Sequence, residues 1–146
     1  NGPRREWLIN ERDRLALKNV SFFDTVIKSK VPVILNTIDV SVIPLRKLDL
    51  FRGAIPSKIF ESLAMKKPVL LGVEGEAKQL FIDDGKCGLA FEPENDLDLS
   101  EKILLLYCDR QMLLQMGENA RSYVEEKFDR DVITDDFYQV LTNIER

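Results

Sequence analysis

Residues 53–72 have the sequence GAIPSKIFESLAMKKPVLLG, which predicts a loop, then a helix, then a buried strand. Pro56 suits the first position of the helix, where its missing N–H is no loss. The backbone amides that follow have no acceptor within the helix, so they are available to a bound anion. A phosphate is the anion that such helix starts commonly hold. This stretch therefore predicts an anion site at the start of a helix.

The same helix has two different sides. At 100° per residue, Ser57, Lys58 and Glu61 share the polar side. The opposite side is apolar and is expected to pack inward; it consists of Ile59, Phe60, Leu63 and Ala64. A phosphate at the helix start and a sugar hydroxyl at Glu61 could thus belong to one nucleotide.

Short apolar runs alternate with helical segments along the chain, which predicts an α/β fold with a parallel, Rossmann-like sheet flanked by helices. The chain is expected to form a single domain over residues 1–146 that ends in three helices. The expected strands are 19–23, 39–43, 69–71 and 88–91. The expected helices are 5–17, 31–36, the Pro56 helix, 77–82, 97–107, 110–127 and 130–144, with Asp109 and Asp129 as N-caps of the last two. The aromatic residues expected in the core are Trp7, Phe22, Phe23 and Phe91.

Composition narrows the possible chemistry. The 146 residues carry a net charge of −4, which argues against a general nucleic-acid or anionic-membrane surface. The chain contains no histidine, so serine–histidine and cysteine–histidine catalysis are excluded, and no metal site is predicted. Cys87 and Cys108 lack metal-ligand spacing and are expected to be reduced thiols in a cytoplasmic protein.

Ligands of open α/β sheets bind beyond the carboxyl ends of the strands. This rule selects two loops, 45–55 and 72–76, together with the start of the Pro56 helix. Glycines at positions 53, 72 and 75 would allow tight turns and close approach to a ligand. Four cations lie in or next to this region and would suit a nucleoside diphosphate, with a solvated basic loop as the alternative; they are Arg46, Lys47, Arg52 and Lys58.

Individual site residues have two interpretations each. Glu61 is either a surface glutamate stabilised by the helix dipole or an acceptor for two ribose hydroxyls. Glu76 is either a charge at a helix start or a ligand contact. Ser57 fits a cap or a phosphate donor better than a nucleophile, because no base accompanies it. Lys58 is expected to bind phosphate rather than to form a Schiff base.

Several of these motifs resemble the donor-binding domain of retaining GT-B glycosyltransferases, the glycosyl transferases group 1. The most specific part is Pro56–Pro68, and the bacterial enzymes that build surface polysaccharides are the most similar. Further matching stretches are 39–45, Gly75-Glu76-Ala77, 116–121, 123–128 and, at the start, Asn1-Gly2-Pro3. The likeness covers essentially the whole chain.

The resemblance implies sugar transfer from a nucleotide-sugar with retention at the anomeric carbon, without a cofactor or metal. Glu61 would hold the nucleotide ribose, and the backbone around Ser57, Lys58 and Ile59 would lie near the diphosphate. Lys58 is the residue expected to act in catalysis, by stabilising the leaving diphosphate. The family commonly has an acidic residue at the position of Gly53, so the backbone of Gly53 and Ala54 is expected to replace its contact to the donor sugar. Gly75 and Glu76 complete the predicted site.

The resemblance also implies that the first strands of the donor domain and the whole acceptor domain lie outside this chain, which is expected to have little transferase activity alone. The acceptor would be a glycan or a lipid-linked glycan, the full protein could associate peripherally with a membrane, and the chain could form a homodimer through Phe137, Leu141 and Ile144. The alternatives are a GT-B-like nucleotide-sugar epimerase, which would need acids and histidines that are absent here, and a non-catalytic Rossmann-like interaction module.

Overall fold

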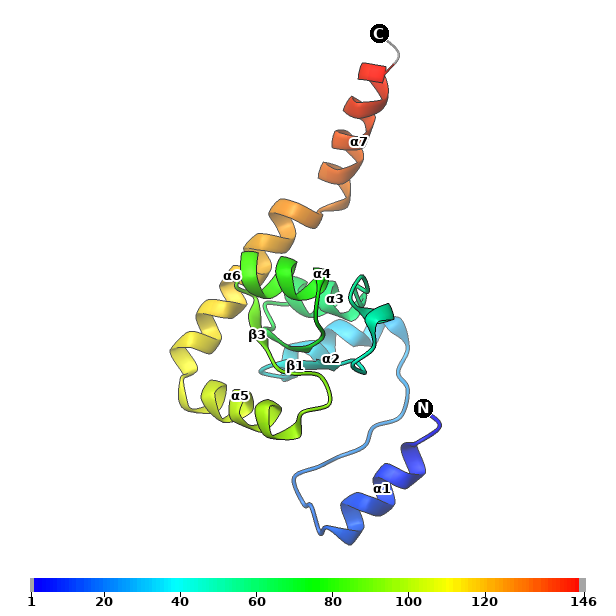
Figure 1. Cartoon of the computed structure of the whole chain (residues 1–146), viewed down its shortest axis with the longest axis vertical. Coiled ribbons are helices and arrows are strands. Elements are labelled where there is room, and N and C mark those ends of the chain that lie inside the picture. The colour runs from blue at the N-terminus through cyan, green and yellow to red at the C-terminus, as the bar shows by residue number, and fades with distance from the viewer. Residues whose placement is uncertain (1, 145–146) are drawn as a thin grey trace. The chain divides into compact units, whose positions relative to one another are not determined.

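The computed structural model describes residues 2–144 (Figure 1). The chain divides into two compact units, Asn1–Val31 and Pro32–Arg146. Asn1, which belongs to the predicted Asn1-Gly2-Pro3 match, lies outside the described residues. Within residues 2–144, no helix is both long enough and apolar enough to cross a membrane.

The first unit contains little regular structure. Its helix α1 (Arg5–Arg14) ends three residues before the predicted end, and the short 3₁₀ helix η1 (Lys28–Lys30) lies near its other end. None of its described residues is buried. Trp7 and Phe23 are 57% and 84% exposed, so their prediction as core residues is wrong, and Phe22 is only half-buried.

The predicted strand at residues 19–23 is absent, and this segment has no regular structure. β-Propensity stabilises a strand only when a neighbouring strand takes up its N–H and C=O groups. Within the described part of the chain, no strand pairs with this segment. The prediction was wrong because propensity is local and strand pairing is not.

The second unit is built on a parallel sheet of three strands in the order β1 (Ser41–Pro44), β2 (Val69–Gly72) and β3 (Gly88–Ala90). In the register, Ile43 lies beside Leu71, which lies beside Ala90. The central strand β2 is buried along its whole length, as the apolar run of residues 69–72 predicts. The predicted α/β fold with a parallel sheet is confirmed.

Helices cover both faces of this sheet. Their bounds are α2 (Val31–Thr37), η2 (Asp49–Phe51), α3 (Lys58–Ala64), α4 (Glu76–Lys78), the π-helical η3 (Gln79–Asp84), α5 (Asp96–Cys108), α6 (Arg110–Phe128) and α7 (Arg130–Ile144). The three C-terminal helices match the predicted ones within one residue at each end. Asp109 and Asp129 accept hydrogen bonds from the amides of Met112 and Asp131, both at 2.8 Å, as expected of N-caps. Asp83 and Asp84 lie in the last turn of η3.

The two faces of the sheet bury different clusters. Leu71 packs with Ile59 and Leu63 of α3, which confirms the predicted inner side of that helix. Leu70, one residue earlier and on the opposite face, packs with Phe91 and with Leu106 of α5. Phe91 is therefore the one predicted aromatic core residue that is fully confirmed.

An aromatic cluster joins α3 to η3 and α6. The ring of Phe60 lies 5.4 Å from that of Phe81 and 5.2 Å from that of Phe128, centroid to centroid, both edge to face. Tyr123 of α6 completes the cluster, 5.8 Å from Phe128. These contacts hold α3 against the unit from its inner side.

By contrast, α7 has no buried residue, and the side chains of Phe137, Leu141 and Ile144 on it are exposed.

Candidate functional site

The carboxyl ends of β1 and β2 bring two loops together, as the sheet rule predicts. The amide of Leu45, directly after β1, donates to the carbonyl oxygen of Gly72 at 2.9 Å. The amide of Glu76 donates to the carbonyl oxygen of Arg52 at 2.8 Å. Gly75 has a φ of +82°, and a Cβ atom there would overlap the Arg52 carbonyl. Glycine at position 75 is therefore required by both conformation and space. The loops 45–55 and 72–76 form one continuous surface.

The glycines at 53 and 72 differ from Gly75 in what surrounds them. A Cβ at Gly72 would overlap the ring of Phe91, so this glycine makes room for a core residue. A Cβ at Gly53 would meet nothing within 4 Å. Gly53 lies exposed in the loop, next to the half-buried Ala54, whose amide donates to the carbonyl of Phe51 at 3.1 Å.

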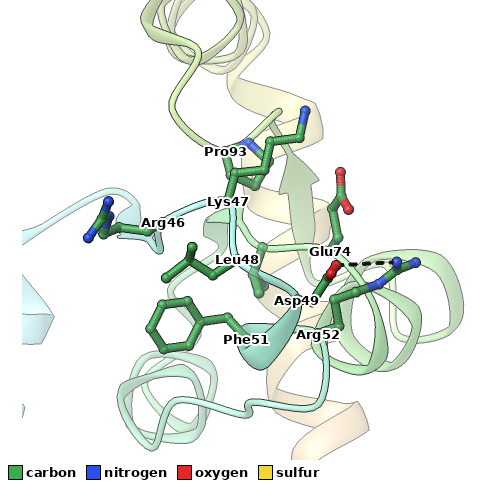
Figure 2. Close-up of a pocket in the computed structure, with 9 residues that line it drawn as sticks. Arg46, Lys47, Leu48, Asp49, Phe51, Arg52, Glu74 and Pro93 are labelled. Carbon is green, nitrogen blue, oxygen red and sulfur yellow. Dashed lines mark ion pairs between the residues drawn. The ribbon is translucent and has the colours of Figure 1, made fainter.

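A hollow of about 100 Å³ opens on this surface (Figure 2). Basic, acidic and apolar side chains from three loops line it: Arg46, Lys47, Leu48, Asp49, Phe51, Arg52, Val73, Glu74 and Pro93. Figure 2 shows the side chains of Arg46 and Arg52 pointing away from each other on opposite sides of the hollow. Three of the four predicted cations thus gather here, whereas Lys58 does not line the hollow.

Each of these three cations lies near a carboxylate. Lys47 Nζ donates to Glu92 Oε1 at 2.7 Å. Arg46 lies 3.7 Å from Glu94, and Arg52 lies 3.9 Å from Asp49. The hydrogen bond from Lys47 lowers the pKa of Glu92 and raises that of Lys47 itself. The positive charge of this loop is therefore balanced locally by exposed carboxylates.

The start of α3 differs slightly from the prediction. The helix begins at Lys58, two residues after Pro56, with Ser57 as its N-cap residue but without a hydrogen bond from the Ser57 side chain. The amide of Ile59 donates to the carbonyl of Pro56 at 3.0 Å. The amides of Ser57 and Lys58 have no hydrogen-bond partner among residues 2–144. The amide of Phe60 likewise has no partner there, so these three amides remain available to an anion.

The side chains of α3 divide as its periodicity predicts. Ser57, Lys58 and Glu61 are exposed on its polar side. Ile59 is fully buried and its amide is already bonded, so it offers no polar donor to a ligand. Glu76, at the start of α4, is exposed next to Gly75. The structure joins Gly75 and Glu76 to Arg52, but it does not place Glu61 in the hollow.

Two acidic residues near the hollow were missed from the sequence. Glu92, which binds Lys47, and Glu94, which lies near Arg46, belong to the loop after β3. The rule that selected the loops after β1 and β2 applies equally to the loop after β3 and could have found both. In the part of the chain that the structure describes, no three acidic or cysteine side chains lie close enough together to hold a metal ion.

The fold is that of glycosyltransferase domains of known structure. HepE from Anabaena, in complex with UDP and glucose, superposes with a TM-score of 0.77 at 20% identity; the likeness covers 94% of this chain and 36% of HepE. TarM from S. aureus was solved as a mutant with fondaparinux, α-GlcNAc-glycerol and UDP. It superposes with a TM-score of 0.72 at 20% identity, and the likeness covers 94% of this chain and 27% of TarM. The C-terminal domain of LpcC from Francisella tularensis superposes with a TM-score of 0.69 at 18% identity, and the likeness covers 88% of this chain and 66% of that domain.

The family model described as glycosyl transferases group 1 matches residues 1–123. The chain therefore belongs to this family, as the sequence resemblance implies. No curated protein matches it. The chain spans about a third of the length of HepE, 36%.

Proposed function

We propose that this chain binds the nucleoside diphosphate of a sugar donor and that it is the donor-binding part of a retaining glycosyltransferase. The observation that carries the proposal is the hollow at the carboxyl edge of the sheet, because three cations, Arg46, Lys47 and Arg52, line it. Family membership supports the reaction class, and the UDP in the HepE and TarM structures supports the ligand class.

We propose for α3 the roles that the family resemblance implies, and the exposure of its polar side supports them. Glu61 accepts hydrogen bonds from the ribose hydroxyls, since it is an exposed carboxylate on a packed helix. The amides of Ser57 and Lys58 and the ammonium of Lys58 bind the diphosphate. Ile59 supports these residues by packing beneath them, because its side chain is buried and its amide is bonded.

The neighbouring loops would hold the sugar end of the donor. The exposed backbone of Gly53 and the adjacent Ala54 face the donor sugar, and Gly75 and Glu76 contact the ligand from the loop after β2. In the transfer, the bond between the anomeric carbon and the diphosphate oxygen breaks, a bond to the acceptor oxygen forms, and the proton of the acceptor hydroxyl passes to the leaving diphosphate. Negative charge develops on the diphosphate, and Lys58 stabilises it as the catalytic residue.

We further propose that the acceptor is a glycan or a lipid-linked glycan of a bacterial surface polysaccharide, bound by a domain other than this one. The reaction is expected to occur in the cytoplasm, where the full protein can associate peripherally with the membrane. Self-association through Phe137, Leu141 and Ile144 is part of the same proposal, since these side chains are exposed on α7.

The test is calorimetric titration of the chain with UDP and with GDP, because the base is not assigned. Glu61→Ala is expected to weaken binding by about 1–3 kcal/mol, the cost of leaving hydrogen-bonding groups unpaired. Glu101→Ala is the matched control, since Glu101 is an exposed glutamate on α5. Its affinity should equal that of the wild type.

Absence of binding by a folded chain contradicts the proposal. Equal losses in Glu61→Ala and Glu101→Ala contradict the role of Glu61. If only one of the two nucleotides binds, that result also identifies the base of the donor.

A further inference from the structure

The helix that carries the proposed nucleotide contacts is too short to be rigid by itself. α3 has seven residues, and isolated helices of fewer than about 12–15 residues are marginal in water. Its inner side is fixed by Ile59 and Leu63, which are fully buried. Its polar side, with Glu61, is exposed. The orientation of Glu61 on the exposed side therefore depends both on this packing and on what holds the ends of the helix.

Arg121 of α6 binds the carboxyl end of α3. Its Nη1 donates to the carbonyl oxygen of Ala64 at 2.5 Å, and its Nη2 lies 2.5 Å from Glu125 Oε1. The last carbonyls of a helix have no partner within the helix and carry partial negative charge. A guanidinium at this point supplies both a hydrogen bond and the opposite charge.

Two further contacts join α6 to the same turn. A Cβ at Gly117, one helical turn before Arg121, would lie 2.6 Å from the carbonyl oxygen of Lys66, so glycine lets the two backbones approach. Lys66 has a φ of +57° and donates through Nζ to Glu118 at 2.7 Å. The carboxyl end of α3 is thus held by one face of α6.

We propose that Arg121 is a positioning residue for nucleotide binding. By holding the carbonyl of Ala64, it fixes the orientation of Glu61, one turn earlier on the same helix, without itself touching the nucleotide. This inference rests on the proposed function, since it assumes that Glu61 binds the ribose. It adds to that function a dependence of the donor site on Arg121 of α6, the penultimate helix.

The test is a double-mutant cycle of Arg121→Met with Glu61→Ala, read as affinity for UDP and GDP below the unfolding temperature. Arg121→Met is expected to weaken binding about three- to tenfold when Glu61 is present and not at all in Glu61→Ala. Arg121→Lys should restore most of the affinity, because an ammonium can still donate to Ala64. Glu125→Ala is the matched control, since it removes the other partner of Arg121 and leaves the Ala64 contact intact.

A merely structural role for Arg121 would lower the unfolding temperature and leave the affinity of the folded chain unchanged, and that result overturns the inference. Equal losses in both backgrounds also overturn it. If the wild type binds neither nucleotide, the proposed function fails together with this inference; if Glu61→Ala weakens binding and Arg121→Met does not, only this inference fails. Should Arg121→Met not fold, Arg121→Ala, which also removes the donor and has the highest helix propensity, takes its place in the cycle.

Discussion

The two cysteines have very different surroundings, and these decide their chemistry. Cys87 is fully buried, and its thiol lies 3.2 Å from the carbonyl oxygen of Gly85. Burial raises the pKa of Cys87 from 9.0 to about 12, because the thiolate would lose its hydration. Cys108, at the end of α5, is exposed.

Cys87 is therefore expected to stay protonated and unreactive at pH 8 and at pH 10, whereas Cys108 reacts at both. A chromogenic disulfide reagent should titrate one thiol in the native chain and two in urea. The Cys108→Ser variant is the control and should show none in the native state. Two rapidly reacting thiols in the native wild type would contradict the burial of Cys87.

Residues whose role is set by their immediate neighbours were predicted correctly. Asp109 and Asp129 cap helices because a short carboxylate reaches the amides two or three residues ahead. Trp7 and Phe23 were wrongly placed in the core, because their type favours burial but nothing in the sequence says what would cover them.

At the scale of elements, the α-helices and the three strands of the sheet could be predicted because each carries its own local pattern of apolar residues, whereas the short 3₁₀ helices η1 and η2 could not. The contacts between loops could not, since they depend on which strand ends lie side by side. The pair of Lys47 and Glu92 is an example: 45 residues separate them in the sequence, and their side chains meet at 2.7 Å. The predicted cation was identified, but its carboxylate partner was not.

This ion pair between the loops after β1 and β3 makes a prediction about affinity. If Lys47 binds the donor diphosphate, Glu92 competes with it, so Glu92→Gln is expected to bind UDP more tightly, by about two- to fivefold at low salt. The gain should shrink in 0.5 M salt, about three times the physiological ionic strength, where exposed charges are screened. Glu101→Gln, another exposed glutamate, controls for the change in net charge. Unchanged or weaker binding by Glu92→Gln would show that Lys47 does not meet the diphosphate.

At the scale of the whole molecule, burial is confined to the second unit. All buried residues belong to Pro32–Arg146, and none of residues 2–31 is buried. Between α1 and η1 the backbone forms no regular structure. Segments of this kind are the preferred sites of proteolytic cleavage.

Limited trypsin digestion is therefore expected to cut first at Lys18, between α1 and η1, and to leave a resistant fragment that contains the sheet. Mass spectrometry of the early products checks this. Lys66 and Lys86 are internal references within the second unit and should be cut later. Early cleavage at either of them would show that the sheet region opens as readily as the first unit.

The close contact of Gly75 with the Arg52 backbone also limits how this edge of the sheet can diverge. An insertion in either loop would separate the two backbones, and any other residue at position 75 would collide with Arg52. The lengths of the two loops are therefore coupled to each other. Relatives that change their donor would be expected to do so by exchanging side chains on a loop pair of constant length, with glycine retained at this one position.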